Sequence, residues 1–422
     1  MSDVLSLVRG AQRRLATCSS DTRSAALRAL ASLIASRDAL IDASNQCDLA
    51  DVTLAPQLRQ RLRLSSAKRQ ELIASVTQLA SWADPLGEIV TQTVLDDGLT
   101  LDKVKSPIGV VLVIFESRPD AVIQIASLAI RSGNAVVLKG GAEAAESNRV
   151  LVACVRDALA EAGLDPEAVT LVEGRAAVRE LLNRDDVIDL VIPRGSNSMV
   201  RSIQESTRIP VLGHAEGICH LYLDALADTT MAVRLAVDGK CDYPAACNAT
   251  ETILVHASFL DRISLVCDAL FSRNVEIRGD ERLRSVVARA KPASDADFHT
   301  EHGALIVNLK VVDGIKEAIA HIQTYGSAHT DAICTSDVEA AERFLNEVDS
   351  ASVFHNASTR FADGYRYGLG AEVGVSTSRI HARGPVGVDG LMTTRWLLRG
   401  SGQVVSEYSS GERHYKHERL KG

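Results

Sequence analysis

The spacing of apolar positions changes along this chain of 422 residues, and each change marks a different kind of element. From about Val4 to Trp82 the apolar side chains recur mostly every three, four or seven residues, which is typical of amphipathic helices. Two strand-like runs, 89–95 and 99–104, then flank Asp96-Asp97-Gly98. This arrangement predicts a β-hairpin after a helical N-terminal region.

Alternating strand and helix patterns follow the hairpin. Continuous apolar runs predict buried strands at 109–115, 135–139, 169–173 and 187–192, and helical patterns lie at 122–132 and 143–162. A second block starts at Cys247, with strands predicted at 251–255 and 304–308 and helices at 260–272 and 315–325. Because strands that alternate with helices form parallel sheets covered on both faces, we predict an α/β fold with two doubly wound domains.

Charge and composition narrow the class of protein. A net charge of −8 argues against a nucleic-acid partner, since no strongly basic surface is implied. No apolar run approaches the roughly 20 residues of a membrane-spanning helix, and the first residues lack the layout of a signal peptide. The eight cysteines are scattered, without zinc-type spacing, so we expect no metal site, no membrane partner and a reducing, cytoplasmic location.

One loop cysteine is the strongest candidate for chemistry. Cys247 lies in the segment Ala245-Ala246-Cys247-Asn248-Ala249-Thr250, after a turn-like stretch and before a strand-like run. A thiolate in this position can attack a carbonyl carbon and form a thioester that a second reagent cleaves. On position alone, Cys247 could also be one more buried small residue.

The loop after the first buried strand is a candidate ligand site. Ligands of doubly wound sheets bind beyond the carboxyl ends of the strands, where Ser117 and Arg118 are expected. Arg118 could hold a phosphate or carboxylate through two hydrogen bonds, or it could be a surface arginine before a helix.

Two further strand ends could bind a cofactor. Lys139-Gly140-Gly141 would let the backbone approach a ligand while the ammonium meets its oxygens, although a simple turn would use the same residues. Gly195 and Ser196, after Arg194, open a predicted helix and could bind a pyrophosphate or merely cap the helix.

Taken together, the segments of this chain resemble the γ-glutamyl phosphate reductases, a branch of the aldehyde dehydrogenase superfamily. Nine stretches carry the resemblance, in the expected order between about residues 90 and 380. They are 107–111, 115–119, 138–141, 193–195, 217–220, 246–252, 329–333, 356–364 and 368–374.

The resemblance implies an aldehyde dehydrogenase-like arrangement of three parts. A cofactor-binding domain would comprise residues 1–236, with a return segment at about 370–395. A catalytic domain carrying the nucleophilic cysteine would comprise 237–369. The hairpin 91–106 and the C-terminal strand and tail, 396–422, would form an oligomerisation element, so a homo-oligomer is expected.

The resemblance also implies the reaction: NADPH-dependent reduction of L-glutamyl 5-phosphate to L-glutamate 5-semialdehyde, on the way to proline. Cys247 would displace phosphate, and the thioester would then be reduced. Since the acyl phosphate is unstable in water, a transient contact with glutamate 5-kinase is a further expectation.

Site roles follow from the same resemblance. The catalytic residues would be Cys247 and Asn248, with the Ser117 hydroxyl and the Cys247 backbone N–H as oxyanion donors. The residues expected to bind the cofactor are Lys139, Gly140, Gly141, Arg194, Gly195, Ser196 and Glu372. The candidates for substrate binding, by charge and position only, are Arg118, His329 and Arg360.

Two departures from relatives separate this reaction from the alternatives. Hydrolytic aldehyde dehydrogenases carry a glutamate that activates water, but the corresponding segment here is 213–217 and no glutamate is clearly in register. NAD-preferring relatives often carry a glutamate three residues after the strand-end lysine, where this chain has Ala142, which favours NADPH, although Glu143 is adjacent. A hydrolytic NAD(P)-dependent enzyme and a non-catalytic relative remain the alternatives.

Overall fold

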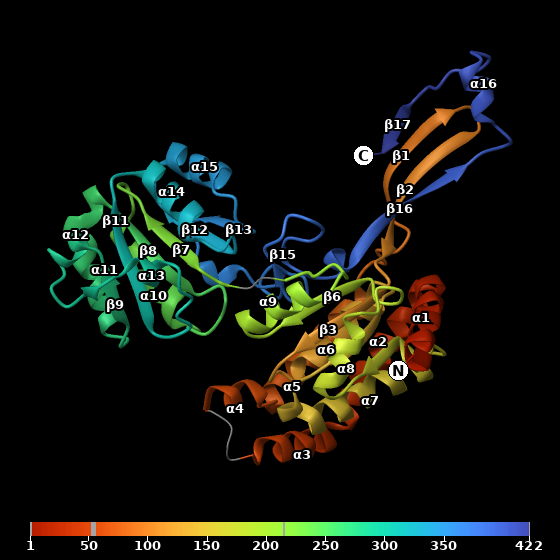
Figure 1. Ribbon diagram of the computed structural model, residues 1–422, viewed down its shortest axis with the longest axis horizontal. Coiled ribbons are helices and arrows are strands. Elements are labelled where there is room, and N and C mark those ends of the chain that lie inside the picture. Colours follow the sequence, from red (N-terminus) through yellow and green to blue (C-terminus); the bar gives the residue numbers. More distant parts are fainter. Residues whose placement is uncertain (1, 52–55, 214–215, 422) are drawn as a thin grey trace.

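Two α/β bodies and a projecting β-sheet arm make up the protein (Figure 1). The computed structural model describes residues 2–51, 56–213 and 216–421. Each body contains a parallel sheet, and the arm is a separate antiparallel sheet. The predicted α/β class with two sheets and a small β element is therefore confirmed.

The first body is built on a four-stranded parallel sheet in the order β5-β4-β3-β6. Its strands are β3 (Val110–Phe115), β4 (Ala135–Lys139), β5 (Val169–Leu171) and β6 (Leu190–Arg194). All six side chains of β3 are buried, as expected for a strand covered on both faces. The last strand begins three residues later than the predicted run at 187–192.

The helices of the first body lie around this sheet, and all except α4 contribute to one apolar core with it. They are α1 (Ser2–Thr17), α2 (Ser20–Ser36), α3 (Asp38–Leu49), α4 (Pro56–Leu62), α5 (Ser66–Ser81), α6 (Asp120–Arg131), α7 (Ala145–Glu161), α8 (Arg175–Leu181) and α9 (Asn197–Ser206). Ser19 and Ser65 start α2 and α5, because each hydroxyl accepts a hydrogen bond from a backbone N–H of the first turn.

The second body contains a seven-stranded parallel sheet in the order β10-β9-β11-β8-β7-β12-β13. Its strands are β7 (Cys219–Leu223), β8 (Thr250–His256), β9 (Glu276–Gly279), β10 (Lys291–Pro292), β11 (Ile306–Val312), β12 (Thr330–Cys334) and β13 (Ser352–His355). Its helices are α10 (Thr229–Cys241), α11 (Ile263–Phe271), α12 (Glu281–Arg284), α13 (Asp295–Phe298), α14 (Ile315–Tyr325) and α15 (Val338–Glu347).

The second sheet begins earlier in the chain than the expected start of the domain that carries Cys247. Strand β7 pairs in parallel with β8, with Cys219 opposite Thr250, and α10 packs in the apolar core of this sheet. The boundary expected at 236/237 would cut through α10. The physical reason for the correction is that β7 forms its hydrogen bonds with the second sheet and not with the first.

The segment after residue 370 returns to the first body, as expected. Ala371, Val373 and Val386 are buried in the core formed by the N-terminal helices and the first sheet. A short antiparallel pair, β14 (Val375–Ser376) and β15 (Gly384–Pro385), lies within this segment.

The arm is a four-stranded antiparallel sheet in the order β16-β2-β1-β17. Strands β1 (Ile89–Asp96) and β2 (Leu99–Pro107) form the predicted hairpin, β16 (Met392–Arg399) adds to β2, and β17 (Glu418–Lys421) adds to β1. The return segment and the C-terminus therefore complete a sheet that the hairpin starts.

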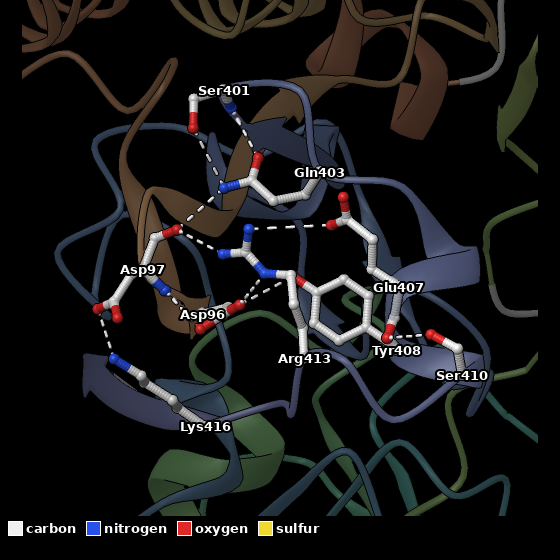
Figure 2. A network of polar contacts seen from close by, with 9 residues as sticks. All are labelled: Asp96, Asp97, Ser401, Gln403, Glu407, Tyr408, Ser410, Arg413 and Lys416. Carbon is white, nitrogen blue, oxygen red and sulfur yellow. Dashed lines mark hydrogen bonds and ion pairs between the residues drawn. The ribbon is translucent and has the colours of Figure 1, made fainter.

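Polar contacts fasten the C-terminal segment to the hairpin turn (Figure 2). Arg413 Nε donates to Asp96 Oδ2 at 2.7 Å, and the Tyr408 hydroxyl donates to the same oxygen at 3.1 Å. The Gln403 amide donates to the Asp97 carbonyl at 2.9 Å. Val405 begins a short helix, α16 (Val405–Ser409), which follows Gln403.

Candidate active site

Cys247 lies in a tight turn directly before β8. Two backbone hydrogen bonds close the turn, from Ala246 N to Tyr243 O at 3.1 Å and from Ala249 N to Ala246 O at 2.9 Å. The Cys247 side chain is only partly buried, whereas Cys219 and Cys267 are enclosed. The turn thus keeps a thiol accessible at an end of the catalytic sheet, as a nucleophile requires.

A second segment, 217–219, forms the wall behind this turn. A Cβ on Gly217 would lie 2.7 Å from Cys247 Cα and would collide with the Cys247 carbonyl, so only glycine allows this approach. The Cys219 thiol donates to the Cys247 carbonyl oxygen at 3.2 Å. Burial raises the pKa of Cys219 well above its ordinary value, with help from Asp331, so it remains a thiol.

Side chains from two loops fix the wall itself. Glu301 Oε2 accepts a hydrogen bond from Gly217 N, and Ser327 Oγ accepts one from Ile218 N, both at 2.9 Å. These bonds satisfy consecutive backbone donors beside the nucleophile. The position of Cys247 therefore depends on residues that are far apart in the sequence.

Asn248 and Arg360 connect the nucleophile turn to the loop around residue 360. The Asn248 amide donates to Ala362 O at 2.9 Å and to Arg360 O at 3.4 Å. Arg360 Nε donates to Asp242 Oδ2 at 3.1 Å, at the start of the turn. Both side chains are buried, so the structure places them as supports of the turn.

His329 is enclosed behind the nucleophile. Its side chain is fully buried, with Nδ1 2.8 Å from Thr330 Oγ1 and 3.7 Å from Cys219 Sγ. The ring is therefore not exposed for the direct contact with substrate that the sequence predicted. The ring instead contacts the thiol that supports Cys247.

A buried ion pair lies next to the same wall. Lys240 Nζ and Glu251 Oε2 are 2.9 Å apart, and both side chains are fully enclosed. Glu251 Oε1 accepts a further bond from Gly303 N at 3.2 Å, two residues from Glu301. Burial raises the pKa of Glu251 to about 7, although Lys240 opposes the shift.

Ser117 is tied to a carboxylate. Its backbone has φ 47°, a left-handed conformation that is uncommon for a non-glycine residue. Its N–H and its hydroxyl both donate to Glu143 Oε1 at 2.7 Å. Burial alone would raise the pKa of Glu143. The bonds from Ser117, a backbone hydrogen bond and the charge of Lys139 together outweigh burial and lower that pKa. The hydroxyl predicted to serve an oxyanion is thus occupied by Glu143.

Side chains of the first body lie close to the two glycines after Lys139. A Cβ on Gly140 would collide with the Asn148 amide, and one on Gly141 would collide with the Glu143 carboxylate. Ala142 is exposed, whereas the Glu143 side chain turns back toward Ser117. Lys139 ends β4, so its side chain leaves the sheet at the edge where ligands of such folds bind.

The end of β6 brings Arg194 beside Glu372. Arg194 Nη2 lies 3.7 Å from Glu372 Oε1, and Glu372 Oε2 accepts a bond from Gly364 N at 2.8 Å. Ser196 caps α9, because its hydroxyl accepts from Met199 N at 3.4 Å. Gly195 and Ser196 are exposed at the start of this helix.

Comparison with known proteins identifies the family. The aldehyde dehydrogenase family model matches residues 3–280. A protein of Cyanothece sp. named γ-glutamyl phosphate reductase is 51% identical over 97% of this chain and 95% of its own length. A Pelotomaculum thermopropionicum protein of the same name is 48% identical over 100% and 98%. The crystal structure of the Thermotoga maritima γ-glutamyl phosphate reductase is 34% identical, with a TM-score of 0.92 over 95% and 99% of the two chains.

The chain is a member of the γ-glutamyl phosphate reductase family. The family, fold and enzyme class predicted from the sequence are confirmed, and family membership implies a nicotinamide cofactor.

Within this γ-glutamyl phosphate reductase fold, sequence reasoning missed the residues that support the nucleophile. Cys219, Glu301 and Ser327 had no assigned role, and only the position of Gly217 in a family motif could have pointed to this wall. Glu216, nearest to the glutamate of hydrolytic relatives, forms an ion pair with Arg201 of α9. Residues 214 and 215 lie outside the described residues.

Two cavities of the protein lie away from the Cys247 thiol. Cavities of about 520 and 330 Å³ lie at the root of the arm and against the return segment, and Cys247 lines neither of them. Within residues 2–51, 56–213 and 216–421, no helix is long and apolar enough to cross a membrane. The same ranges contain no group of three His, Cys, Asp or Glu side chains placed to hold a metal ion.

Proposed function

We propose that this protein reduces L-glutamyl 5-phosphate to L-glutamate 5-semialdehyde and phosphate with NADPH, through a thioester on Cys247. The observation that carries the proposal is the accessible Cys247 turn, braced by Gly217 and Cys219 at the end of the catalytic sheet. The relatives named γ-glutamyl phosphate reductase support the substrate class, and the product would enter proline synthesis.

In the first half of the reaction, the Cys247 sulfur attacks the acyl carbon. A carbon–sulfur bond forms, the bond from carbon to the phosphate oxygen breaks, and phosphate leaves with the electron pair. In the second half, the carbon–sulfur bond breaks as the carbon is reduced, and the thiolate is released with the aldehyde. The Cys247 backbone N–H is our proposed oxyanion donor, and Asn248 holds the turn in place.

NADPH would supply the hydride for the second half. The residues proposed to hold it are Lys139, Gly140, Gly141, Gly195, Ser196 and Glu372, at the end of β4, at the start of α9 and in the return segment. A helix N-terminus and a lysine suit a pyrophosphate. The exposed Ala142 leaves space for a 2′-phosphate, and Glu143 is held away from that position by Ser117.

The substrate carries a carboxylate, an amino group and a phosphate. Arg118 is our proposed contact for an anionic group, because its side chain is about half exposed at the end of β3. Arg360 and His329 are both buried, so neither is proposed to touch the substrate. Arg360 would act by supporting the Cys247 turn, and His329 would act through its contact with Cys219. Ser117 would act indirectly by holding Glu143, or its hydroxyl would donate to the oxyanion after giving up its bond to Glu143.

A hydrolytic aldehyde dehydrogenase is the second candidate. It needs a carboxylate that activates water against the thioester. Glu216 is paired with Arg201, and Glu301 accepts a bond from Gly217 N, which argues against either as a free base. A non-catalytic relative would not need an accessible thiol in a supported turn, so the Cys247 turn argues against this alternative.

We also propose a homo-oligomer assembled through the arm. β16 lies at the end of its sheet, and Trp396 and Leu398 on it are more than half exposed, at 56% and 58%. A transient contact with glutamate 5-kinase fits an acyl phosphate that water destroys. A cytoplasmic site of action fits the free cysteines of the chain. Sedimentation of the protein alone, and then with the kinase, tests both contacts.

The reverse reaction tests the function directly. Glutamate 5-semialdehyde, NADP⁺ and phosphate are supplied to wild type and to Cys247→Ala, and reduced cofactor is followed by absorbance. We expect phosphate-dependent turnover that disappears in Cys247→Ala. Turnover without phosphate would indicate the hydrolytic enzyme, and no turnover by folded wild type would favour the non-catalytic relative.

A further inference from the structure

Two arginines lie together at the carboxyl ends of β3 and β6. The register of these parallel strands pairs Phe115 with Arg194, and Glu116 N donates to Arg194 O at 3.2 Å. Arg118 follows Phe115 by three residues, in the loop after β3, so both arginines lie at the same edge of the sheet. Such an edge is where ligands of these folds bind.

The acidic neighbours of the two arginines do not use up their donors. Arg118 Nη2 contacts Asp120 Oδ2 at 3.2 Å, which raises the pKa of Arg118. Arg194 Nη2 is 3.7 Å from Glu372 Oε1, which is longer than a hydrogen bond, and Gly364 N occupies the other oxygen of Glu372.

Arg194 carries a donor that the protein does not satisfy. Its Nη1 is buried and has no hydrogen-bond partner in the part of the chain that the structure describes. Buried polar groups are normally paired, so an unpaired guanidinium nitrogen at a ligand-binding edge indicates an anionic partner that arrives with the ligand. A guanidinium has five N–H donors in a planar fork, which suits a phosphate.

The electrostatics of Arg194 connect it to Arg118 and to the Cys247 thiol. Burial first, and then the charge of Arg118, lower the pKa of Arg194, while Glu372, Asp120 and the Cys247 thiol oppose the shift. The electrostatic neighbours of Arg194 are thus Arg118, two carboxylates and the thiol. A second positive charge and an unpaired donor match the needs of a leaving phosphate.

We propose that Arg118 and Arg194 together bind the phosphate group of the acyl phosphate, and that Arg194 serves this group and not the cofactor. The assignment rests on the proposed function. As sulfur bonds to the acyl carbon, the carbon–oxygen bond breaks and its electron pair moves to phosphate, whose charge the two guanidinium groups stabilise. In the reverse direction the same pair would hold inorganic phosphate for attack on the thioester.

The test separates phosphate binding from cofactor binding. In the reverse reaction, Arg118→Gln and Arg194→Gln are compared with wild type for KM of phosphate, and NADP⁺ dissociation constants are measured by titration without turnover. We expect KM of phosphate to rise at least tenfold in each variant, with NADP⁺ affinity within about twofold. Arg149→Gln, an exposed arginine of α7 paired with Glu146 and Glu173, is the matched control.

A second readout needs no turnover. Inorganic phosphate should slow alkylation of Cys247 by iodoacetamide in wild type and in Arg149→Gln, and should lose this effect in Arg118→Gln and Arg194→Gln. Arg194→Lys keeps a positive charge and tests the role of the fork if Arg194→Gln does not fold. Weakened NADP⁺ binding with an unchanged KM for phosphate, or no change in either, would overturn the proposal. Absent phosphate dependence in wild type would instead refute the proposed function.

Discussion

The thiol of Cys219 donates a hydrogen bond to the backbone carbonyl of Cys247 across 3.2 Å. The two cysteines come from β7 and from the turn before β8, which pair in the catalytic sheet. The buried Cys219 thiol thus holds the peptide group of the accessible Cys247. The orientation of the nucleophile is set by this neighbour as well as by its own turn.

Removing the Cys219 donor should slow the reaction without changing cofactor affinity. Cys219→Ala leaves the Cys247 carbonyl without this donor, which costs about 1 kcal/mol and should lower turnover roughly fivefold. Steady-state turnover and NADP⁺ titration measure the two effects. Cys219→Ser keeps a donor and should lie closer to wild type; equal activity of both variants and wild type would show that the bond does not position Cys247.

The buried Lys240–Glu251 pair should make stability sensitive to single substitutions. Lys240→Met leaves a carboxylate buried without its partner and should lower the free energy of unfolding by about 3–5 kcal/mol. The double variant Lys240→Met with Glu251→Gln should recover part of the loss, because no charge remains enclosed. Urea unfolding of the three proteins decides this, and equal stability of the single and double variants would contradict it.

The same pair predicts a pH dependence of stability. Glu251 has a pKa of about 7 in the folded protein and an ordinary value of 4.5 unfolded, so the folded state binds the extra proton between these values. The free energy of unfolding should therefore fall as pH rises from about 4.5 to about 7, by about 3 kcal/mol from this group. Urea titrations across this range should show a shallower fall in Lys240→Met with Glu251→Gln, where neither residue titrates.

The surroundings of Ala142 predict how the enzyme selects its cofactor. A glutamate at this exposed position would place a negative charge near the proposed 2′-phosphate. Ala142→Glu should therefore lower kcat/KM with NADPH at least tenfold, about 1.4 kcal/mol, while changing it little with NADH. Ala142→Gln, similar in size but neutral, is the control, and an equal loss with both cofactors would point to a steric effect.

The sequence predicted best those elements that local patterns define. β4 (Ala135–Lys139) and α14 (Ile315–Tyr325) have the predicted bounds, because a continuous apolar run and a helical periodicity are visible within a few residues. The hairpin was equally clear from Asp97 and Gly98 between its strands. Cys247 stood out because its loop precedes a strand.

Features that depend on distant contacts were not predictable in this way. β7 is short and pairs with β8, where Cys219 lies opposite Thr250. Gly217 is required by the backbone of Cys247, and the glycines after Lys139 lie against Asn148 and Glu143. Local periodicity reveals neither relationship. Arg194 was assigned to the cofactor from its motif, and only the folded chain brings it beside Arg118 and Glu372.

The central claim is a thioester on Cys247, and trapping it is the most direct test. The protein is incubated with glutamate 5-semialdehyde and NADP⁺ without phosphate, quenched in acid and analysed by peptide mass spectrometry. A glutamyl adduct on the peptide that contains Cys247, released when phosphate is added before the quench, is the predicted result. Cofactor reduction with no adduct on Cys247, or an adduct on another cysteine, would contradict the account.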